Sequence, residues 1–265
     1  MEYFNNRLKN HIQDFSSALC VGLDISPESL GNSKSITHCI DHSKRVIDAT
    51  IDLAAAFKAN LAFFERWGSA GFKWLEHILE YINNRKITIA DGKRGDIGNT
   101  AEQYANSIFD HFGFDAVTVN PYMGKDAIIP FINRPEKGAF ILCKTSNPSS
   151  GDFQNSLNGR TNLFELVAKK SVELNTLKNV GLVVGATVPE EIKRIRHIAP
   201  ELPFLIPGVG SQGGDLEKSV RFGNDNGIAL ISISRGIIFA GDKSEKSIRS
   251  TAKEYRDKMM DCIHG

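Results

Sequence analysis

The sequence lacks several features that would point to particular classes of protein. Its four cysteines form no CxxC pair, and it has no run of about 18 apolar residues, so neither a zinc or redox motif nor a membrane-spanning helix is expected. Charge of one sign is also not in excess, with 32 lysines and arginines against 31 acids and a net charge of +1. Bulk charge therefore gives no support to a nucleic acid or an anionic membrane as a partner.

The cysteines and the N-terminus indicate the compartment. Cys20 and Cys143 lie within apolar runs, which predicts buried thiols and favours a reducing environment. The first 15 residues hold no apolar stretch of the kind that a secretory signal contains. We therefore expect a cytoplasmic protein.

Eight short apolar segments alternate with helical patterns along the chain. Most are apolar at almost every position, as expected of parallel strands that are covered on both faces. The segments between them, such as 161–174 and 188–198, place apolar residues at helical spacing, and the first helix is expected over about 40–56. The predicted strands are 18–24, 56–64, 87–91, 115–121, 138–145, 181–187, 203–208 and 227–234.

Eight strand–helix repeats in a chain of this length predict an α/β fold, a (β/α)8 TIM barrel formed as a single domain over residues 1–265. An open doubly wound sheet is the competing arrangement, because periodicity does not reveal whether a sheet closes. The count of eight and the absence of a GxGxxG motif after the first strand favour the barrel. The long polar stretch 147–162 is interpreted either as a lid or as a surface insertion.

Charged residues gather where the predicted strands end, which is the edge at which barrel enzymes carry their catalytic groups. Asp91, Lys93, Arg94 and Asp96 follow one buried strand within six residues. Because residues i and i+2 of a strand share a face, Asp91 and Lys93 should point together and Arg94 away from them. With Lys58 on the preceding strand, these residues predict a Lys-Asp-Lys-Asp row.

The sequence leaves two interpretations of this row open. Alternating charges can keep all four groups ionised in a partly dry pocket, as a reaction centre requires. Each neighbouring contact is worth about 4 kcal/mol before desolvation at an effective dielectric constant near 20. A structural ion network at the rim of the barrel would show the same spacing. We favour the reaction centre.

The segment 207–215, with the sequence PGVGSQGGD, predicts a phosphate site. Its four glycines precede a helix that is expected to begin near Asp215, and glycine-rich turns at helix starts present backbone N–H groups to anions. Arg235, at the end of the eighth strand, adds a planar fork for phosphate. The loops after strands seven and eight form the common phosphate site of this barrel.

Three further signals have ordinary explanations. Thr100 has the spacing of a helix capping box with a glutamine three residues later. His38 and His42 are spaced as metal ligands but lack an acidic or thiolate set beyond Cys39, so we expect no metal there. Lys144 is interpreted as a solvated charge.

Taken together, these segments resemble the orotidine 5'-phosphate decarboxylases. The similarity runs in the family's order from about Asp24 to Gly236, and the KRGDIG form of the second motif resembles the longer-loop branch. Gly92 stands where alanine is frequent, but the charged positions are intact. The matching motifs are FKANLAFFE (57–65), DGKRGDIGNTA (91–101), VTVNPYMGKD (117–126), KTSNP (144–148), VVGAT (183–187), IPGVGSQGGD (206–215) and SRG (234–236).

The resemblance implies a homodimeric barrel that converts orotidine 5'-monophosphate to uridine 5'-monophosphate in de novo pyrimidine biosynthesis, with no metal or organic cofactor. It implies that Lys93 protonates C6 of the pyrimidine beside Lys58 and Asp91, whereas Asp96 and Thr100 reach into the partner's site. The remaining contacts would be Asp24 and Asn60 with the ribose and its neighbours, Ser146 with the pyrimidine, Thr145 close by, and Gln212, Gly213 and Arg235 with the phosphate.

Rival functions fit parts of the same pattern. A related barrel decarboxylase for a sugar phosphate would hold a divalent metal through its acids, and an aldolase would use Lys58 or Lys93 as a Schiff-base nucleophile. Flanking acids argue against the aldolase, because they keep a lysine protonated. A phosphate sensor built on a decayed barrel would not need all four charges of the row.

Overall fold

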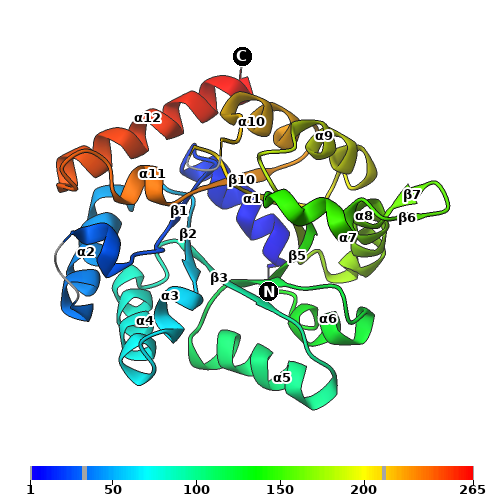
Figure 1. The fold of residues 1–265 in the computed structure, drawn as a ribbon, viewed down its shortest axis with the longest axis horizontal. Coiled ribbons are helices and arrows are strands. Elements are labelled where there is room, and N and C mark those ends of the chain that lie inside the picture. Colours follow the sequence, from blue (N-terminus) through cyan, green and yellow to red (C-terminus); the bar gives the residue numbers. More distant parts are fainter. Residues whose placement is uncertain (1, 32–34, 211–212, 265) are drawn as a thin grey trace.

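The computed structural model describes residues 2–31, 35–210 and 213–264, and at its centre is a closed barrel of parallel strands (Figure 1). The strands follow the order β1-β10-β9-β8-β5-β4-β3-β2 around the barrel. They are β1 (Leu19–Gly22), β2 (Ala56–Asn60), β3 (Ile87–Arg94), β4 (Ala116–Val119), β5 (Gly138–Lys144), β8 (Val180–Val184), β9 (Phe204–Pro207) and β10 (Ala229–Ile233). Each predicted strand segment overlaps one of them, so the predicted (β/α)8 barrel is confirmed.

Helices form a ring outside the strands (Figure 1). This ring consists of α2 (Ile36–Thr50), α4 (Ser69–Ile82), α5 (Gly98–Asn106), α6 (Lys125–Ile132), α8 (Leu163–Leu174), α9 (Pro189–Ile198), α10 (Leu216–Asn224) and α12 (Glu245–His264). Short helices α3 (Ala62–Glu65), α7 (Gly151–Gln154) and α11 (Arg235–Ile238) come after β2, β5 and β10, and single turns are η1 (Pro27–Leu30), η2 (Ser107–His111), η3 (Pro148–Ser150) and η4 (Asn175–Leu177). None of the described helices has the length and apolar character needed to cross a bilayer.

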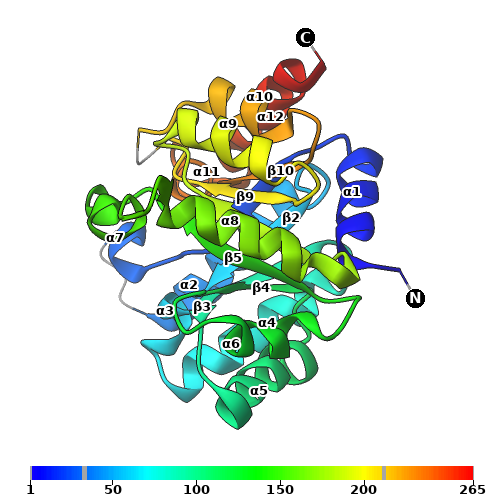
Figure 2. The same ribbon diagram turned by 90° about the vertical axis from the view of Figure 1, so that its right-hand side faces the viewer.

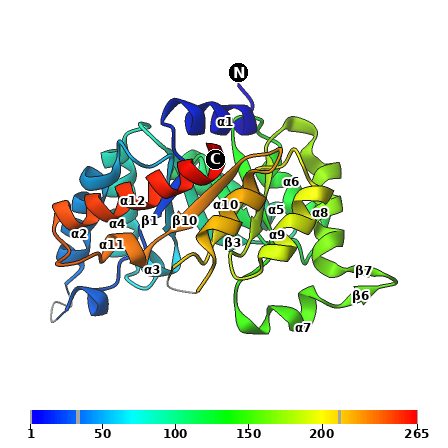
Figure 3. The same ribbon diagram turned by 90° about the horizontal axis from the view of Figure 1, so that it is seen from above.

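Helix α1 (Phe4–Asp14) closes the N-terminal end of the barrel, and Figures 2 and 3 show it on the opposite side of the molecule from α7. Phe4, Leu8 and Ile12 are buried against inward-facing strand residues, and burial of each contributes about 1.5–3 kcal/mol. Phe4 meets Phe140 edge to face, with ring centroids 6.1 Å apart. Helix α1 thus acts as a plug for this end of the barrel. A Cβ atom at Gly138 would lie 2.3 Å from the Phe4 ring, so this glycine leaves the space that Phe4 of the plug fills.

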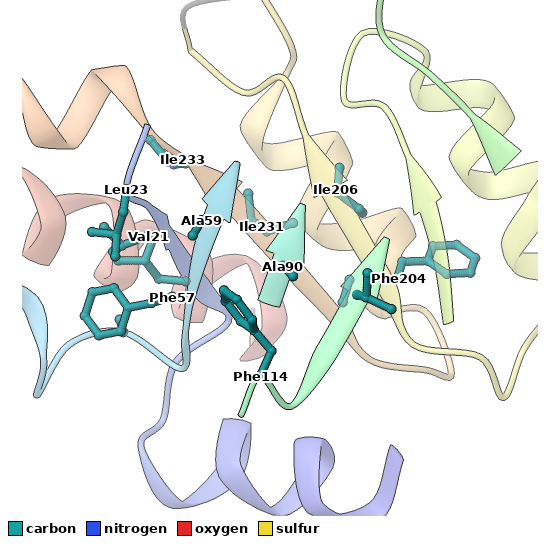
Figure 4. Close-up of a cluster of buried hydrophobic side chains, with 14 of the residues drawn as sticks. Val21, Leu23, Phe57, Ala59, Ala90, Phe114, Phe204, Ile206, Ile231 and Ile233 are labelled. Atoms are coloured by element: carbon teal, nitrogen blue, oxygen red, sulfur yellow. The ribbon is translucent and has the colours of Figure 1, made fainter. Parts of the chain in front are cut away.

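The outward side chains of the strands pack beneath the helices. Figure 4 shows part of this cluster, with Val21 of β1, Phe57 of β2, Ala90 of β3, Ile206 of β9 and Ile231 of β10 among its members. These residues alternate with the inward ones, as the pleat of a strand requires.

The inward side chains change character along the strands. Passing toward the C-terminal end, Ala56 is followed by Lys58 on β2, Ile89 by Asp91 on β3, Ala116 by Thr118 on β4, and Leu230 by Ser232 on β10. The N-terminal half of the interior is therefore apolar and closed by α1, whereas the C-terminal half carries the polar groups.

Several predicted boundaries are wrong, among them the end of the third strand, which runs to Arg94 rather than to 91. The strand expected over 56–64 ends at Asn60, whose side-chain oxygen accepts a hydrogen bond from the Ala62 N–H (3.2 Å) as the chain turns into α3. The helix expected first, over about 40–56, spans Ile36–Thr50, because the Ser35 hydroxyl caps its start by accepting from the Thr37 N–H (3.1 Å). It is not the first helix, since α1 precedes it.

The polar stretch 147–162 is folded. It contains η3, α7 and a hairpin of β6 (Leu157–Asn158) and β7 (Thr161–Asn162), and it lies on the side away from α1 (Figure 3). Phe153 and Leu157 are 72% and 67% exposed within it. The segment therefore presents apolar side chains at the polar end of the barrel.

Candidate active site

Three residues of the predicted charge row meet inside the C-terminal end of the barrel. The Lys58 Nζ lies 3.2 Å from Asp91 Oδ2, and the Lys93 Nζ lies 2.7 Å from Asp91 Oδ1. The contact arises because β2 and β3 are paired in register, with Lys58 and Asp91 both facing inward. The Asp91 carboxylate is thus held between two ammonium groups.

Asp24 extends this row on the β1 side. Its Oδ1 lies 3.8 Å from the Lys58 Nζ and accepts a hydrogen bond from the Asn60 N–H at 3.2 Å. The structure therefore brings the predicted Asp24 and Asn60 next to the charge row.

Burial and charge act against each other in this row. Burial lowers the pKa of Lys58, but the carboxylates of Asp24 and Asp91 outweigh it and raise that pKa above its ordinary value. Burial raises the pKa of Asp91, but the charges of Lys58 and Lys93 outweigh it and hold that pKa well below its usual range. Lys58 and Asp91 therefore remain ionised at neutral pH, although their side chains are only 6% and 12% exposed.

Strand β3 bulges where Asp91 and Lys93 lie. Three residues of β3, 91–93, face only Thr118 of β4. Lys93 has a φ of +45°, a left-handed conformation that costs about 1–3 kcal/mol for a residue with a side chain. Simple alternation predicted that Asp91 and Lys93 would point together, and the bulge produces that contact through a less regular backbone.

Thr118 is a site residue that the sequence analysis missed. Its hydroxyl donates to Asp91 Oδ1 at 3.0 Å and accepts from the Lys93 N–H at 2.9 Å. A signal for it was present: Thr118 lies within the motif VTVNPYMGKD, and alternation along the fourth strand turns it inward.

Arg94 points away from the row, as predicted. Its guanidinium pairs with Glu65 of α3 and lies 5.2 Å from the centre of the Tyr104 ring of α5. It therefore links α3 to α5.

Asp96 and Thr100 do not join the row within one chain. Asp96 Oδ1 accepts from the Ile97 N–H at 2.8 Å, and among the described residues it pairs with neither Lys58 nor Lys93. Thr100 is exposed on α5.

The predicted capping box at Thr100 is wrong. Helix α5 begins at Gly98, with Ile97 as its N-cap and no side-chain cap, so Thr100 already lies inside the helix. Gln103 donates to Asn99 Oδ1 at 3.2 Å instead of reaching back to a cap.

Lys144 is buried, so its prediction as a solvated charge is wrong. It is 2% exposed, and its Nζ donates to Ser150 Oγ and Asn155 Oδ1, both at 3.1 Å. Burial lowers the pKa of Lys144, partly offset by the charge of Glu191. The folded 148–155 stretch covers this lysine.

The same stretch holds Thr145. The Thr145 N–H donates to Gln154 Oε1 at 2.9 Å, and the Gln154 Nε2 donates to Thr145 Oγ1 at 2.8 Å. The next residue, Ser146, accepts through its carbonyl from the Thr187 hydroxyl at 3.3 Å. Thr145 and Ser146 therefore lie where β5 leaves the barrel, at the edge of the polar interior.

The glycine-rich segment follows β9 and turns tightly. Gly208, Gly210 and Gly213 all have positive φ, and the Gly213 N–H donates to the Gly210 carbonyl at 2.9 Å. Asp215 caps α10 by accepting from the Lys218 N–H at 3.0 Å, so the predicted helix start is confirmed.

The other predicted phosphate ligands lie beside this turn or beyond the described residues. Arg235 opens α11 directly after β10, the strand next to β9. The predicted Gln212 lies outside the described residues.

The cysteines and histidines form no second centre in the part of the chain that the structure describes. No group of three or more His, Cys, Asp or Glu side chains there has the geometry to hold a metal ion, and His42 Nε2 lies 2.6 Å from the Ile238 carbonyl oxygen. All four cysteines are free, and Cys20 and Cys143 are buried, as predicted. Burial raises the pKa of Cys20 to about 12.

A closed parallel barrel that carries the ionised pair of Lys58 and Asp91 at its C-terminal end is typical of enzymes of the TIM-barrel class. Comparison with known proteins makes this specific. The chain belongs to the Orotidine 5'-phosphate decarboxylase / HUMPS family, whose model matches residues 17–249.

Individual relatives agree over nearly the whole chain. The chain is 45% identical to orotidine 5'-phosphate decarboxylase of Dehalococcoides mccartyi, over 98% of this chain and 97% of that one. It is 43% identical to the protein of the same name from Natronomonas pharaonis, over 98% of both chains. The solved structure of Leishmania donovani OMP decarboxylase superposes with a TM-score of 0.89 at 38% identity, covering 99% of each chain.

Proposed function

We propose that this protein converts orotidine 5'-monophosphate to uridine 5'-monophosphate and CO2 in pyrimidine biosynthesis, as a carbon–carbon lyase. Family membership and relatives that carry this name over nearly their full length support the activity. The observation that carries the proposal is the Asp91 carboxylate, which stays ionised between the ammonium groups of Lys58 and Lys93.

The reaction breaks the bond between C6 of the pyrimidine and its carboxylate. CO2 leaves, the electron pair stays on C6, and a proton must then be delivered to that carbon. Lys93 is the proposed donor, because its ammonium is half exposed at the open end of the row and its charge stabilises the developing carbanion before it gives up the proton. Solvent then restores the proton to Lys93.

Asp91 is proposed to face the departing carboxylate. Two like charges held close together repel each other, and the repulsion ends when neutral CO2 leaves. Lys58 keeps Asp91 ionised, and the Asp24 carboxylate beside it keeps Lys58 charged. The same charges argue against a Schiff-base aldolase, since a nucleophilic lysine must lose its proton.

The phosphate is proposed to bind between the 207–215 turn and Arg235. Arginine offers a bidentate fork, and the turn offers backbone N–H groups. The Gly213 N–H is bonded within the turn, so its contact with phosphate requires that bond to open. Binding energy at this remote group then supports orientation of C6 against Lys93.

We also infer a homodimer in which Asp96 and Thr100 complete the partner's charge row. Asp96 leaves its own row, and large apolar side chains are exposed on the elements around it: Ile97 (54%), Tyr104 (37%), Tyr122 (87%), Met123 (47%) and Ile129 (41%). Exposed apolar groups that gather near polar ones are typical of protein interfaces. Equilibrium sedimentation should give twice the chain mass, and mixing inactive Lys93→Ala with inactive Asp96→Ala chains should restore part of the activity.

The experiment that tests the activity is loss of orotidylate absorbance when purified protein is added. Turnover should persist after treatment with a chelator, and Lys93→Ala protein is the matched negative control. Absence of turnover by the folded wild-type protein would refute the proposed function. Activity that disappears on chelation and returns with a divalent metal would favour the metal-dependent sugar-phosphate enzyme instead.

A further inference from the structure

Thr118 faces the three-residue bulge of β3, and the mechanism above does not use it. Its side chain is buried, with the residue 1% exposed. One hydroxyl donates to Asp91 Oδ1 (3.0 Å) and accepts from the Lys93 N–H (2.9 Å). A single oxygen atom therefore joins the two charged residues on which decarboxylation depends.

The bulge explains why a hydroxyl is needed at this position. Regular pairing of β3 with β4 is interrupted between Ala90 and Arg94, so the Lys93 N–H has no ladder partner, and a buried N–H without a partner is costly. The Asp91 carboxylate can accept a further hydrogen bond and the Lys93 N–H needs an acceptor, and one hydroxyl can serve both. Threonine also has few χ1 rotamers, which fixes the direction of its oxygen.

The same hydrogen bond supports the unusual backbone of Lys93. A lysine at φ +45° persists only when its surroundings hold it there. Without the Thr118 oxygen, the Lys93 N–H would be free to turn toward water, and the lysine backbone could relax to a commoner conformation. The ammonium group would then leave its place 2.7 Å from Asp91 Oδ1.

We propose that Thr118 is a positioning residue for the decarboxylation, which acts through Asp91 and Lys93 without contacting the reacting carbon. The inference rests on the proposed function, because it assigns Thr118 a task in that reaction. It predicts that the hydroxyl, and not the size of the side chain, determines the turnover rate.

Thr118→Val tests this, because valine keeps the shape and removes only the hydroxyl. We expect kcat to fall about 100-fold, as for a small misplacement of a catalytic group, while KM changes by no more than about threefold. Thr118→Ser restores the hydroxyl and should return kcat to within about fivefold of wild type. The rescue by serine and the split between kcat and KM distinguish positioning from a loss of stability.

Thr88→Val is the matched control. Thr88 lies near the other end of β3, and its hydroxyl donates to Asp115 Oδ2 at 3.2 Å, so the substitution removes the same kind of bond far from the row. We expect a lower melting temperature and unchanged kcat.

Each outcome decides the inference. If wild-type protein does not decarboxylate orotidylate, the proposed function fails, whatever the variants do. If wild type is active and Thr118→Val has wild-type kcat, or if the serine and valine variants are equally slow, the positioning role is refuted. If Thr118→Val does not fold, Thr118→Ala decides in the same way, with wild-type kcat refuting the role.

Discussion

Strand β3 has a lysine at each end, and the two lie in opposite surroundings. Lys86 directly precedes the strand at the end covered by α1; it is 3% exposed, and its Nζ lies 2.8 Å from the centre of the Phe15 ring, with no hydrogen-bond partner among the described residues. Lys93 lies at the open end, half exposed, with its Nζ 2.7 Å from Asp91.

The difference shows what each end of the barrel is built to do. Burial lowers the pKa of Lys86 to about 8, only partly offset by the charge of Asp52, so the covered end disfavours the charged form of this lysine. At the open end, alternating lysines and aspartates keep one another charged. The open end also holds the left-handed backbone at Lys93. Burial therefore dominates at the covered end of the barrel. The charged groups and the strained backbone lie at the other end, where the reaction is proposed.

Substitution of Lys93 is the strongest test of this contrast between the two ends of β3. Lys93→Ala should lower kcat by about 10²–10⁴-fold, because it removes the proposed proton donor, while substrate still binds and the protein stays folded. Single-turnover absorbance assays and thermal unfolding would measure both. Lys86→Met is the matched control at the other end of the strand and should leave kcat unchanged. Substantial turnover by Lys93→Ala would contradict the proton-donor role.

Substitution of Arg235 tests whether the proposed phosphate site contributes to the reaction at the open, C-terminal end of the barrel. Arg235→Ala should lower kcat/KM about 100-fold, since binding energy at the phosphate supports the chemistry at C6. Arg221→Ala, an exposed arginine of α10 that pairs with Glu217, is the control and should match wild type. An unchanged kcat/KM for Arg235→Ala would remove this residue from the site.

Lys144 sharpens the comparison, because it is a buried lysine at the open end. Lys144→Met removes the hydrogen bonds to Ser150 and Asn155, so the 148–155 stretch should loosen and KM should rise about three- to tenfold. Proteolysis within that stretch should also accelerate. Lys170→Met, at an exposed pair with Glu173, should show neither effect. Equal protease resistance of Lys144→Met and wild type would contradict an anchoring role.

Lys86 gives the smallest expected effect, on stability alone. Its pKa is lower in the folded chain (about 8) than its ordinary value of 10.5, so the folded state binds fewer protons between these pH values. The free energy of unfolding of the wild type should therefore rise between about pH 8 and pH 10.5. Below pH 8, the buried charge of Lys86 should lower that free energy by a constant amount.

Replacing Lys86 shows that penalty directly. Lys86→Met should raise the free energy of unfolding at pH 7 by about 1–3 kcal/mol, and by less at pH 10. Urea unfolding at the two pH values measures this. A gain of equal size at both would show that packing, and not ionisation, is responsible.

Much of the fold could be predicted because it depends on local pattern. Continuous apolar runs gave all eight strands, and alternation along the third strand separated Lys93 from Arg94. Asp24, Lys58, Asn60 and Asp91 met as expected, since strand ends converge in a barrel. Their roles toward substrate stay predictions, as do the single-domain organisation and the cytoplasmic location.

The rest depended on contacts that local pattern does not contain. Lys144 was expected in solvent, but Ser150 and Asn155 fold back over it through a segment whose composition predicts no particular conformation. The bulge at Lys93 requires the register between β3 and β4, which periodicity cannot supply. The inward direction of Thr118 could have been predicted from alternation. Its contacts with Asp91 and Lys93 could not, because they depend on that register.

The plug formed by α1 has a consequence for the order of events during synthesis. The Asn5 side chain donates to the Val180 carbonyl, 175 residues further along the chain, and the Phe4 N–H donates to the Pro135 carbonyl. This helix is synthesised before every strand of the barrel, yet its partner residues on the sheet are complete only once β8 has been made. Helix α1 cannot dock before then, so Phe4, Leu8 and Ile12 stay exposed while the strands between them and Val180 are synthesised.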